Sequence, residues 1–591
     1  MQAERSEKLR VWIVAGGLFL ALAGAGVRLC FLHLGNHSQL KEHTQKQRMY
    51  TQKLLGERGR IFDCNGDLVP LAASLSAKLF FVDPLDLKKE HNKEFIITTA
   101  ADALELSRET VANAFSQTNS RYEKLCVSYD NAAIDIMNDK NIISGIGSED
   151  VVIRSYPQGR RMSHVIGLLD KDGNGQAGVE YTYNDHLKGV PGLVTGDKDA
   201  RGRAIGSRPK MKIPPIRGND IHLTLNNNIQ FDVEDALKEV VETIHAVSAW
   251  AIVQDVKTGA ILAMATYPDF DPEQYHIAFR ELWRNHAITT MYEPGSVMKT
   301  ITMAAALNER LVTANTLMNV GYGPFAHAGT TLQNNSNGII TVAHGFKISN
   351  NVVFAKLGLT LTPRRIDAYL RGFGFGSKLG IDLPGEANGI IDAEKRHWSK
   401  WDKVKPTRVP IGQGVSVTGL QMISAYSAIA NGGKLMRPYV VDRIVSSTTG
   451  ENIKENKPYV LASPIGPEVA QAVREMMIDV TEDGTGKKAR VNGYTVAGKT
   501  GTAQCWNAEK KAYSTTEFVA SFVGFVPARD PVFSVLVSID RPAPGYARTG
   551  GAVAAPVFSK IATATARYLL VPPDMPEEND NAWVSVGAHR P

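Results

Sequence analysis

The stretch EPGSVMKTITMAAAL at residues 293–307 reads as a glycine turn that enters a helix. Ser296 and Lys299 are three residues apart, so in a helix both side chains project from one face. A serine hydroxyl is a weak nucleophile until a base removes its proton. A lysine can be that base when desolvation or a nearby cation lowers its pKa. Taken alone, this S-x-x-K spacing fits a helix cap beside a solvated lysine better than a catalytic pair.

A second short motif, Ser349-Asn350-Asn351, lies between this helix and the C-terminal third of the chain. The Ser349 hydroxyl can pass a proton between Lys299 and a leaving amine. The Asn351 amide can donate to a substrate backbone and accept from Lys299. By itself, Ser-Asn-Asn is also a common turn or cap.

A third motif, Lys499-Thr500-Gly501-Thr502, follows a strand-like run. Lys499 can bind a substrate carboxylate, and its charge would keep the other lysine neutral. A glycine in the strand lets an extended peptide approach and pair with the strand edge. The backbone N–H groups of Thr502 and Ser296 would form an oxyanion hole. S-x-x-K, S-x-N and K-T-G in this order indicate a serine acyltransferase. We expect the catalytic residues Ser296, Lys299, Ser349, Asn351 and Lys499, and the substrate-binding residues Thr500, Gly501 and Thr502.

Residues 493–500 also match the P-loop pattern G-x-x-x-x-G-K-[ST]. A P-loop needs a strand before its first glycine and a helix after its last residue. Here the strand lies inside the pattern and Gly501 follows it, so we expect no nucleotide site.

The N-terminal region contains an uncharged apolar stretch, residues 11–27, whose apolar character continues to about residue 34. About 20 apolar residues span a bilayer as a helix. Three basic residues among the first ten favour a cytoplasmic N-terminus. We therefore expect a single-pass anchor in the inner (cytoplasmic) membrane, with the catalytic domain on the periplasmic side. A signal peptide cleaved near Ala21-Leu22-Ala23 is the alternative.

Length and composition narrow the possibilities further. A chain of 591 residues is too long for one core, so we expect two or more domains. The net charge of +6 is mild and does not suggest nucleic-acid binding. Four cysteines at long spacing do not suggest a disulfide scaffold. Without a metal-ligand motif, we expect neither a metal nor another cofactor.

The strand and helix patterns predict a mixed α/β (α+β) fold. Two strand-like runs joined around Thr258-Gly259 predict a hairpin, preceded by an amphipathic helix. Strands return late in the chain, so we expect one antiparallel sheet closed by distant segments and covered by helices. The expected elements are a helix at 229–244, the hairpin strands at 249–253 and 260–265, strands at 494–497, 518–526 and 532–539, and a helix at 559–570.

Outside these elements the patterns are weaker. Residues 35–57 are polar and compatible with a helical stalk, and residues 85–145 look mostly helical. Residues 171–217 read as loops with short strands. The Pro- and acid-rich residues after 570 are expected to be disordered.

With these motifs the chain resembles the class B penicillin-binding proteins, most closely the division-type (FtsI-type) peptidoglycan D,D-transpeptidases. Glu293, before Pro-Gly-Ser, resembles division- or sporulation-type members. Cys64 departs from the family pattern, which commonly has arginine there. The other segments that carry the resemblance are RGRIFDCNG at 58–66, GVE at 178–180, GQGVSVT at 412–418 and ASFVGF at 520–525.

The resemblance implies a transmembrane anchor, an elongated noncatalytic pedestal and a penicillin-binding transpeptidase domain. It implies that Ser296 attacks the D-Ala-D-Ala bond of a stem peptide, that D-alanine leaves, and that an amine of a neighbouring strand takes the acyl group in septal cell-wall synthesis. β-Lactams would be inhibitors, and a SEDS-family glycan polymerase and other divisome membrane proteins would be partners. The expected division of the chain is a cytoplasmic segment (1–10), anchor (11–34), stalk (35–57), pedestal (58–218), transpeptidase domain (219–570) and tail (571–591).

Two alternatives remain at the level of sequence. A D,D-carboxypeptidase or β-lactam-hydrolysing enzyme could share this fold, although we find no counterpart of the deacylating glutamate of class A β-lactamases. A noncatalytic divisome scaffold or β-lactam sensor is the other. The three intact motifs argue against a scaffold, and only about ten residues precede the membrane helix, which leaves little room for cytoplasmic signalling parts.

Overall fold

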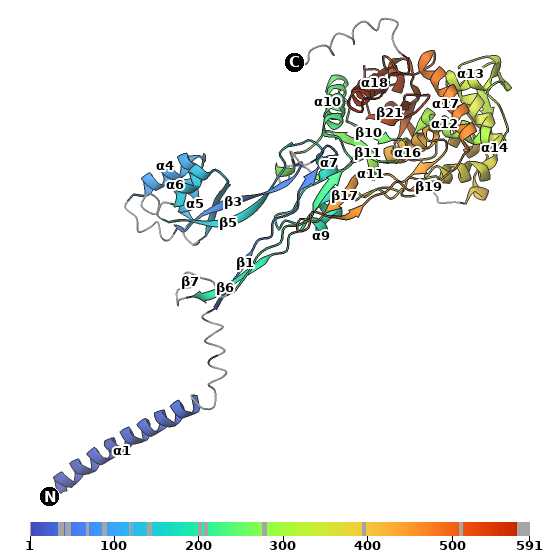
Figure 1. Ribbon diagram of the computed structural model, residues 1–591. Coiled ribbons are helices and arrows are strands. Elements are labelled where there is room, and N and C mark those ends of the chain that lie inside the picture. Colours follow the sequence, from blue (N-terminus) through green and yellow to red (C-terminus); the bar gives the residue numbers. More distant parts are fainter. Residues whose placement is uncertain are drawn as a thin grey trace. The chain divides into compact units, whose positions relative to one another are not determined.

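The computed structural model describes residues 2–32, 41, 49–66, 70–84, 92–117, 120, 122–138, 145–198, 204–205, 211–274, 280–392, 397–507 and 512–575. These residues form two compact units (Figure 1). The first comprises Met1–Glu57 and Gly189–Arg217, and the second comprises Arg58–Lys188 and Gly218–Pro591.

The first unit begins with the long helix α1 (Gln2–Cys30). An 18-residue stretch within its segment Arg5–Cys30 has a mean hydropathy of 1.9, and this is the one helix among the described residues that is long and apolar enough to cross a membrane. This is consistent with a single-pass anchor. Of the expected span 11–34, the last two residues lie outside the described part of the chain.

The rest of the first unit is a small antiparallel sheet. Strand β1 (Met49–Leu54) pairs with β6 (Gly192–Lys198), which also pairs with β7 (Ala204–Ile205) and β8 (Met211–Ile213). The helical stalk expected at 35–57 is therefore wrong where it can be checked, because residues 49–54 form a strand. Their backbone groups find partners some 140 positions away, which a local pattern cannot show. Residues 33–40 and 42–48 lie outside the described residues.

Two sheets of three or four strands lie in the described part of the second unit, apart from its five-stranded sheet. One has the strand order β4-β3-β5 and packs against α4, α5 and α6 around buried Phe80, Ile96 and Val111. The other has the order β18-β17-β9-β2 and joins segments from both ends of the chain. The elements before β9 are β2 (Ile61–Phe62), β3 (Ala73–Val82), α4 (Lys93–Ala103), α5 (Arg108–Ser116), β4 (Glu123–Ser128), α6 (Asn131–Asn138), β5 (Ile146–Ser155), α7 (Ser163–Ile166), α8 (Gly178–Thr182) and α9 (Asn184–Leu187).

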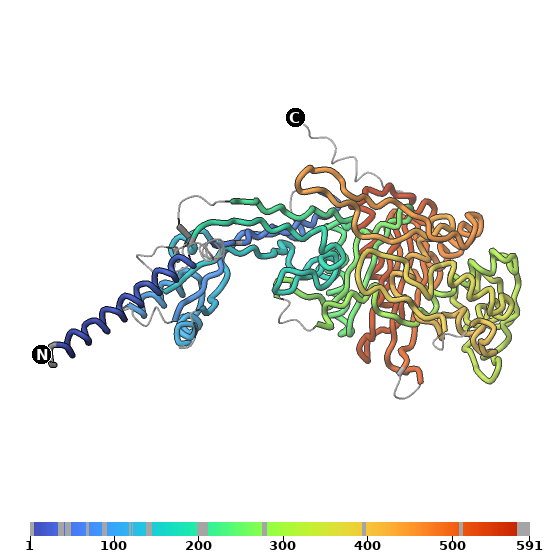
Figure 2. Tube along the Cα trace, turned by 90° about the horizontal axis from the view of Figure 1, so that it is seen from below, coloured from blue at the N-terminus to red at the C-terminus, as the bar shows by residue number. Residues whose placement is uncertain are grey.

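A five-stranded antiparallel sheet with the order β11-β10-β22-β21-β20 organises the catalytic half of this unit. Strand β10 is buried along nearly its whole length because helices cover both faces. In Figure 2 the green strands around residues 248–267 run beside the red strands of residues 512–540, as the pairing of β10 with β22 requires. The strands are β10 (Ser248–Asp255), β11 (Ile261–Tyr267), β20 (Ala497–Asn507), β21 (Ala512–Val526) and β22 (Phe533–Asp540).

The two faces of this sheet build separate cores, because successive strand residues point to opposite sides. Ala249, Ala251 and Val253 pack with helices α10 (Asn227–Ile244) and α18 (Gly550–Tyr568). Trp250 and Ile252 pack on the other side, where α11 (His286–Thr289), α12 (Met298–Asn308) and α16 (Gly419–Ala430) lie. Figure 1 shows α10 and α18 on one side of the sheet and α16 on the other.

The remaining elements of the second unit include β9, β17 and β18 of the four-stranded sheet described above, together with the helices and short strands around α12. They are β9 (Asp220–Leu223), β12 (Leu317–Gly321), β13 (Phe325–His327), β14 (Thr330–Leu332), β15 (Gly338–Thr341), α13 (Val342–Lys347), α14 (Asn351–Gly372), α15 (Lys405–Arg408), β16 (Leu435–Met436), β17 (Val441–Val445), β18 (Asn452–Glu455), β19 (Val460–Ala462) and α17 (Pro467–Glu482). Short 3₁₀ turns are η2 (Pro272–Gln274), η3 (Arg280–Trp283), η4 (Gly295–Val297), η5 (Trp398–Lys400), η6 (Val409–Ile411) and η7 (Lys487–Ala489).

The predicted mixed α/β fold, with an antiparallel sheet closed by distant strands, is confirmed. Several boundaries were wrong. The strand expected at 494–497 begins at Ala497 and continues to Asn507, the strand expected at 518–526 begins at Ala512, and the last helix begins at Gly550 instead of 559. Residues 85–145 include the strand β4 between helices. The tail was also expected to be disordered from 571, yet Asp574 accepts a hydrogen bond from Thr495 N at 2.7 Å, which anchors its first residues. Residues 576–591 lie outside the described chain.

Candidate active site

The turn that carries Ser296 is packed backbone against backbone. Gly295 has a positive φ of 59°, and a Cβ atom built on it would lie 2.8 Å from the carbonyl oxygen of Thr502 in β20. A Cβ on Gly412 would lie only 2.1 Å from Gly295 O. Only glycine fits such approaches, and a positive φ also favours it. Ser296 is therefore held beside strand β20, where the second N–H of the predicted oxyanion hole lies.

Lys299 is fully buried at the start of α12. Its Nζ lies within hydrogen-bond distance of Ser349 O at 2.7 Å, Ser349 Oγ at 3.1 Å and Asn351 Oδ1 at 2.7 Å. The structure thus brings the S-x-x-K lysine and the S-x-N motif together as expected. Among the described residues, no hydrogen bond joins Lys299 Nζ to Ser296 Oγ.

The S-x-N turn is shaped to present its polar atoms to that lysine. Ser349 has a positive φ of 57°, a strained conformation for a residue other than glycine. Asn350 is buried and caps α14, accepting from the N–H groups of Val352 and Val353. The cap fixes the helix start, so Asn351 and both oxygens of Ser349 face Lys299.

Lys499 brings a second buried amine to the same place. Its side chain is fully buried, and its Nζ has no hydrogen-bond partner in the described part of the chain. Burial lowers the pKa of Lys499 from its usual 10.5 to about 7. Burial, followed by the charge of Lys499, lowers the pKa of Lys299 well below its usual value. The geometry therefore favours a neutral Lys299 facing a second amine that lacks a counter-charge.

The other residues of the K-T-G-T motif point to two faces of β20: Gly501 to one, and Thr500 and Thr502 to the other. A Cβ on Gly501 would lie 3.0 Å from both Pro294 O and Val297 Cγ1, so glycine allows the nucleophile turn to pack here. The Thr500 hydroxyl instead lies 2.9 Å from that of Thr485, outside the catalytic cluster. The Thr502 hydroxyl accepts from Gly550 N at 3.1 Å. The side chains of both threonines thus make structural bonds. The P-loop pattern is also excluded here, because β20 continues through residue 507 without a helix.

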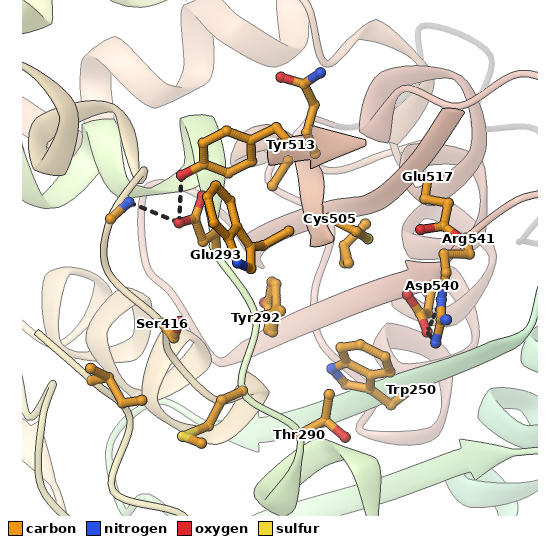
Figure 3. Close-up of a pocket in the computed structure, with 17 residues that line it drawn as sticks. Trp250, Thr290, Tyr292, Glu293, Ser416, Cys505, Tyr513, Glu517, Asp540 and Arg541 are labelled. Atoms are coloured by element: carbon orange, nitrogen blue, oxygen red, sulfur yellow. Dashed lines mark hydrogen bonds and ion pairs between the residues drawn. The ribbon is translucent and has the colours of Figure 1, made fainter. Parts of the chain in front are cut away.

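Beyond Thr502, a cavity of about 580 Å³ adjoins the second half of β20 (Figure 3). It is lined by Ala503 to Trp506 of β20, by the segment before the nucleophile and by parts of β21 and β22. Glu293 connects two of these walls: its Oε1 accepts from Gly414 N and from Tyr513 Oη, each at 2.9 Å. None of the predicted catalytic side chains lines this cavity, which adjoins the K-T-G-T motif only through the next residues of β20.

Comparison with known protein families agrees with this geometry. The description "Penicillin binding protein transpeptidase domain" matches residues 249–563, more than half of the chain. "Penicillin-binding Protein dimerisation domain" matches residues 53–223. The chain belongs to the class B penicillin-binding proteins. A penicillin-binding protein with a transpeptidase domain is an enzyme, and the serine type follows from the family.

Relatives of this penicillin-binding protein are similar along most of its length. Stage V sporulation protein D of Bacillus subtilis is 34% identical over 513 residues, covering 85% of this chain and 77% of that protein. Probable peptidoglycan D,D-transpeptidase PenA of Neisseria gonorrhoeae is 30% identical, with coverage of 95% and 92%. The solved structure of penicillin binding protein 3 of Mycobacterium tuberculosis with aztreonam is 28% identical with a TM-score of 0.66, covering 88% of this chain and 98% of that one.

Sequence reasoning missed two supports of the site in this penicillin-binding protein. Tyr426 Oη, on α16, lies 2.8 Å from Thr300 Oγ1 and donates to Val297 O at 2.8 Å, which anchors the start of α12. Thr485 holds Thr500. Both residues lie in segments without a motif, so only the pairing of distant segments could reveal them.

Proposed function

We propose that this protein is a peptidoglycan D,D-transpeptidase that cross-links stem peptides through an acyl-enzyme on Ser296. One observation carries the proposal: the Lys299 amine is buried, is held by Ser349 and Asn351, and faces Lys499. A neutral amine in this position can accept the proton of a serine hydroxyl. The names of the relatives, among them PenA, support the same reaction.

The reaction follows from the positions of these groups. The Lys499 ammonium binds the C-terminal carboxylate of the donor, which restores a counter-charge to this buried cation. Lys299 takes the proton of Ser296 as Oγ attacks the penultimate carbonyl, while the N–H groups of Ser296 and Thr502 stabilise the oxyanion. The hydroxyl of Ser349 passes the proton to the departing D-alanine. An amine of a neighbouring stem peptide then attacks the acyl-enzyme and restores Ser296.

In this proposal Gly501 lets the donor pair with the edge of β20, and Thr500 and Thr502 contribute through the strand they hold in place.

The division into a cytoplasmic segment, anchor, stalk, pedestal and transpeptidase domain, at the boundaries given above, is part of the same proposal. So are the periplasmic position of the catalytic domain and its work at the septum. A SEDS-family glycan polymerase and other divisome membrane proteins are the proposed partners. Localising a fluorescent fusion tests the septal role, which uniform side-wall fluorescence would contradict.

The decisive experiment compares the purified protein with its Ser296→Ala variant in labelling by a fluorescent penicillin. We expect labelling of the wild type and none of the variant, with matched thermal unfolding curves as the control for folding. Labelling that persists in the variant would refute the proposal. A long-lived acyl-enzyme separates a transpeptidase from a β-lactam-hydrolysing enzyme, which turns over rapidly. A viable Ser296→Ala strain beside an inviable deletion would favour the scaffold.

A further inference from the structure

The cavity beside the second half of β20 is lined by an excess of negative charge. Three carboxylates, those of Glu293, Glu517 and Asp540, face it, whereas Arg541 is its only cationic lining residue among those described. Arg541 already forms an ion pair with Asp540, with Nη2 and Oδ2 2.8 Å apart. The cavity therefore attracts a cationic group.

Two of these carboxylates keep capacity for a ligand. Both hydrogen bonds that Glu293 accepts from the described residues use Oε1, so Oε2 accepts none from them. The Glu517 carboxylate has no hydrogen bond or ion pair within the described chain. Figure 3 shows Cys505 between Glu293 with Tyr513 on one side and Glu517 with Arg541 on the other.

The carboxylates around the cavity contribute to a raised pKa of the Cys505 thiol. Its pKa is raised to about 11, chiefly by burial and then by the charge of Asp540; Glu517 and Glu293 add smaller contributions in the same direction, and Arg541 opposes them. A group at the centre of the cavity is therefore surrounded by net negative charge. A positive charge placed there would be stabilised for the same reason.

The catalytic geometry sets which part of a donor peptide reaches this cavity. Lys499 would bind the donor's C-terminal carboxylate, and the N–H groups beside Thr502 would hold its scissile carbonyl. The donor chain N-terminal to that carbonyl must then continue along β20 toward Trp506. Four strand residues span about 13 Å, enough for the penultimate residue and the side chain of the residue before it. A strand irregularity between Gln504 and Trp506, which leaves Cys505 without a partner in β21, opens the wall at this point.

We propose that the cavity binds the side-chain ammonium group of the donor residue that precedes D-Ala-D-Ala, through Glu517 and Glu293. This inference rests on the proposed transpeptidase function. Cross-linking joins an amine of one stem peptide to the acyl group of another. Donor and acceptor belong to one polymer, so an uncross-linked donor carries the same free amine. The cavity would thus select donors whose amine has not yet been consumed.

The test uses the full-length protein in detergent and two synthetic donors. One has lysine before D-Ala-D-Ala, and the other has norleucine, which keeps the carbon chain but lacks the amine. The D-alanine released in the first turnover measures acylation. We expect the lysine donor to acylate about tenfold faster at equal subsaturating concentration, as for a charge-assisted hydrogen bond. Glu517→Gln should reduce this ratio toward one.

The matched control is Glu455→Gln, which removes the same charge from an exposed residue of β18 outside the cavity. It should leave the ratio unchanged. Labelling by fluorescent penicillin reports on Ser296 alone, and both variants should retain it. A donor ratio near one in the wild type, or one that Glu517→Gln leaves unaltered, overturns the inference while leaving the transpeptidase proposal intact. The inference is also overturned if Glu517→Gln slows only the attack of an added amine on the acyl-enzyme. That result would mean that the cavity binds the acceptor peptide instead of the donor.

A binding readout separates the inference from the chemistry. In a Ser296→Ala variant that retains Cys505 as its one cysteine, alkylation at alkaline pH should be slowed by the lysine donor more than by the norleucine donor. Equal protection by the two peptides would overturn the inference, whatever the acylation rates show.

Discussion

Two clusters of buried charge in this molecule have opposite designs. In one, Glu180 lies between two arginines: Arg58 Nε donates to its Oε2 at 2.5 Å and Arg154 Nε to its Oε1 at 2.7 Å. In the other, the two lysines Lys299 and Lys499 are both fully buried. Among the described residues, no carboxylate forms a hydrogen bond or ion pair with either amine. The first cluster contains its own counter-charges. In the second, the carboxylate of a bound substrate is proposed to supply the counter-charge.

The difference separates a structural charge cluster from a catalytic one. Buried charges are costly unless they are paired and hydrogen-bonded. The Glu180 cluster meets that condition, and it connects segments more than 90 residues apart, because Arg154 Nη1 also donates to Gly59 O. The lysine pair meets this condition only in part, because Lys299 is hydrogen-bonded but Lys499 has no partner among the described residues. Burying Lys499 therefore costs electrostatic free energy at the place where a substrate carboxylate is proposed to bind. Four changes test this contrast, from the largest expected effect to the smallest.

Lys299→Met removes the base while keeping an unbranched side chain of similar size. We expect acylation by fluorescent penicillin to slow about 1,000-fold, within the range for loss of general-base catalysis. The variant also loses the hydrogen bonds of Nζ to Ser349 and Asn351, so we expect a loss of stability of about 1–3 kcal/mol, which thermal unfolding measures separately from acylation. Acylation within a few-fold of wild type would mean that another group removes the serine proton.

Glu180→Ala leaves two buried arginines without their carboxylate. The expected loss of stability is about 3–5 kcal/mol, typical of breaking a buried ion pair. Urea unfolding followed by circular dichroism measures it. Lys560→Gln, which breaks exposed ion pairs with Asp235 and Glu239, is the matched control and should cost about 1 kcal/mol or less. Equal costs for the two variants would mean that burial adds nothing to the stability contributed by the Glu180 cluster.

Lys499→Met should act in the opposite direction, because it removes a buried cation without a partner. We expect a gain in stability of roughly 2–4 kcal/mol near neutral pH, together with severe loss of acylation. Thermal unfolding and penicillin labelling are measured on the same sample. A destabilised variant would show that the lysine has a counter-charge in the folded protein.

Stability should also depend on pH through Lys499. Its pKa is about 7 in the folded protein and 10.5 without these surroundings, so the unfolded chain binds more protons between these values. Stability must therefore rise with pH across that window. In Lys499→Met this contribution disappears, and the slope between pH 7 and 10 becomes smaller than in wild type. Identical slopes in urea titrations of the two proteins would contradict the low pKa.

The sequence predicted the motif-bearing parts of this site well because their chemistry is local. The spacing of Ser296 and Lys299 predicted a turn that enters a helix, and Ser296 lies in the 3₁₀ turn η4 directly before α12, which carries Lys299; the hairpin around residues 258–259 has clear strand patterns. The convergence of Lys299 on Ser349 and Asn351 was also expected from the roles of these residue types.

What could not be predicted depends on contacts between segments distant in the chain. The pairing of β1 with β6 turned a polar, helix-compatible segment into a strand. The Thr500 side chain looked available for substrate, yet Thr485 binds it, because the two meet only once α17 packs against β20. The cavity beside Cys505 likewise depends on the register of β20 against β21, which no short pattern encodes.

The close approach of Gly295, Gly412 and Thr502 has a consequence for how such an enzyme can change under antibiotic pressure. Any side chain added to either glycine would strike main-chain atoms and displace the nucleophile itself. Mutations that spare cell-wall synthesis but repel a drug are therefore barred from this turn. They must arise where side chains already meet solvent, such as exposed Trp506 on the same strand.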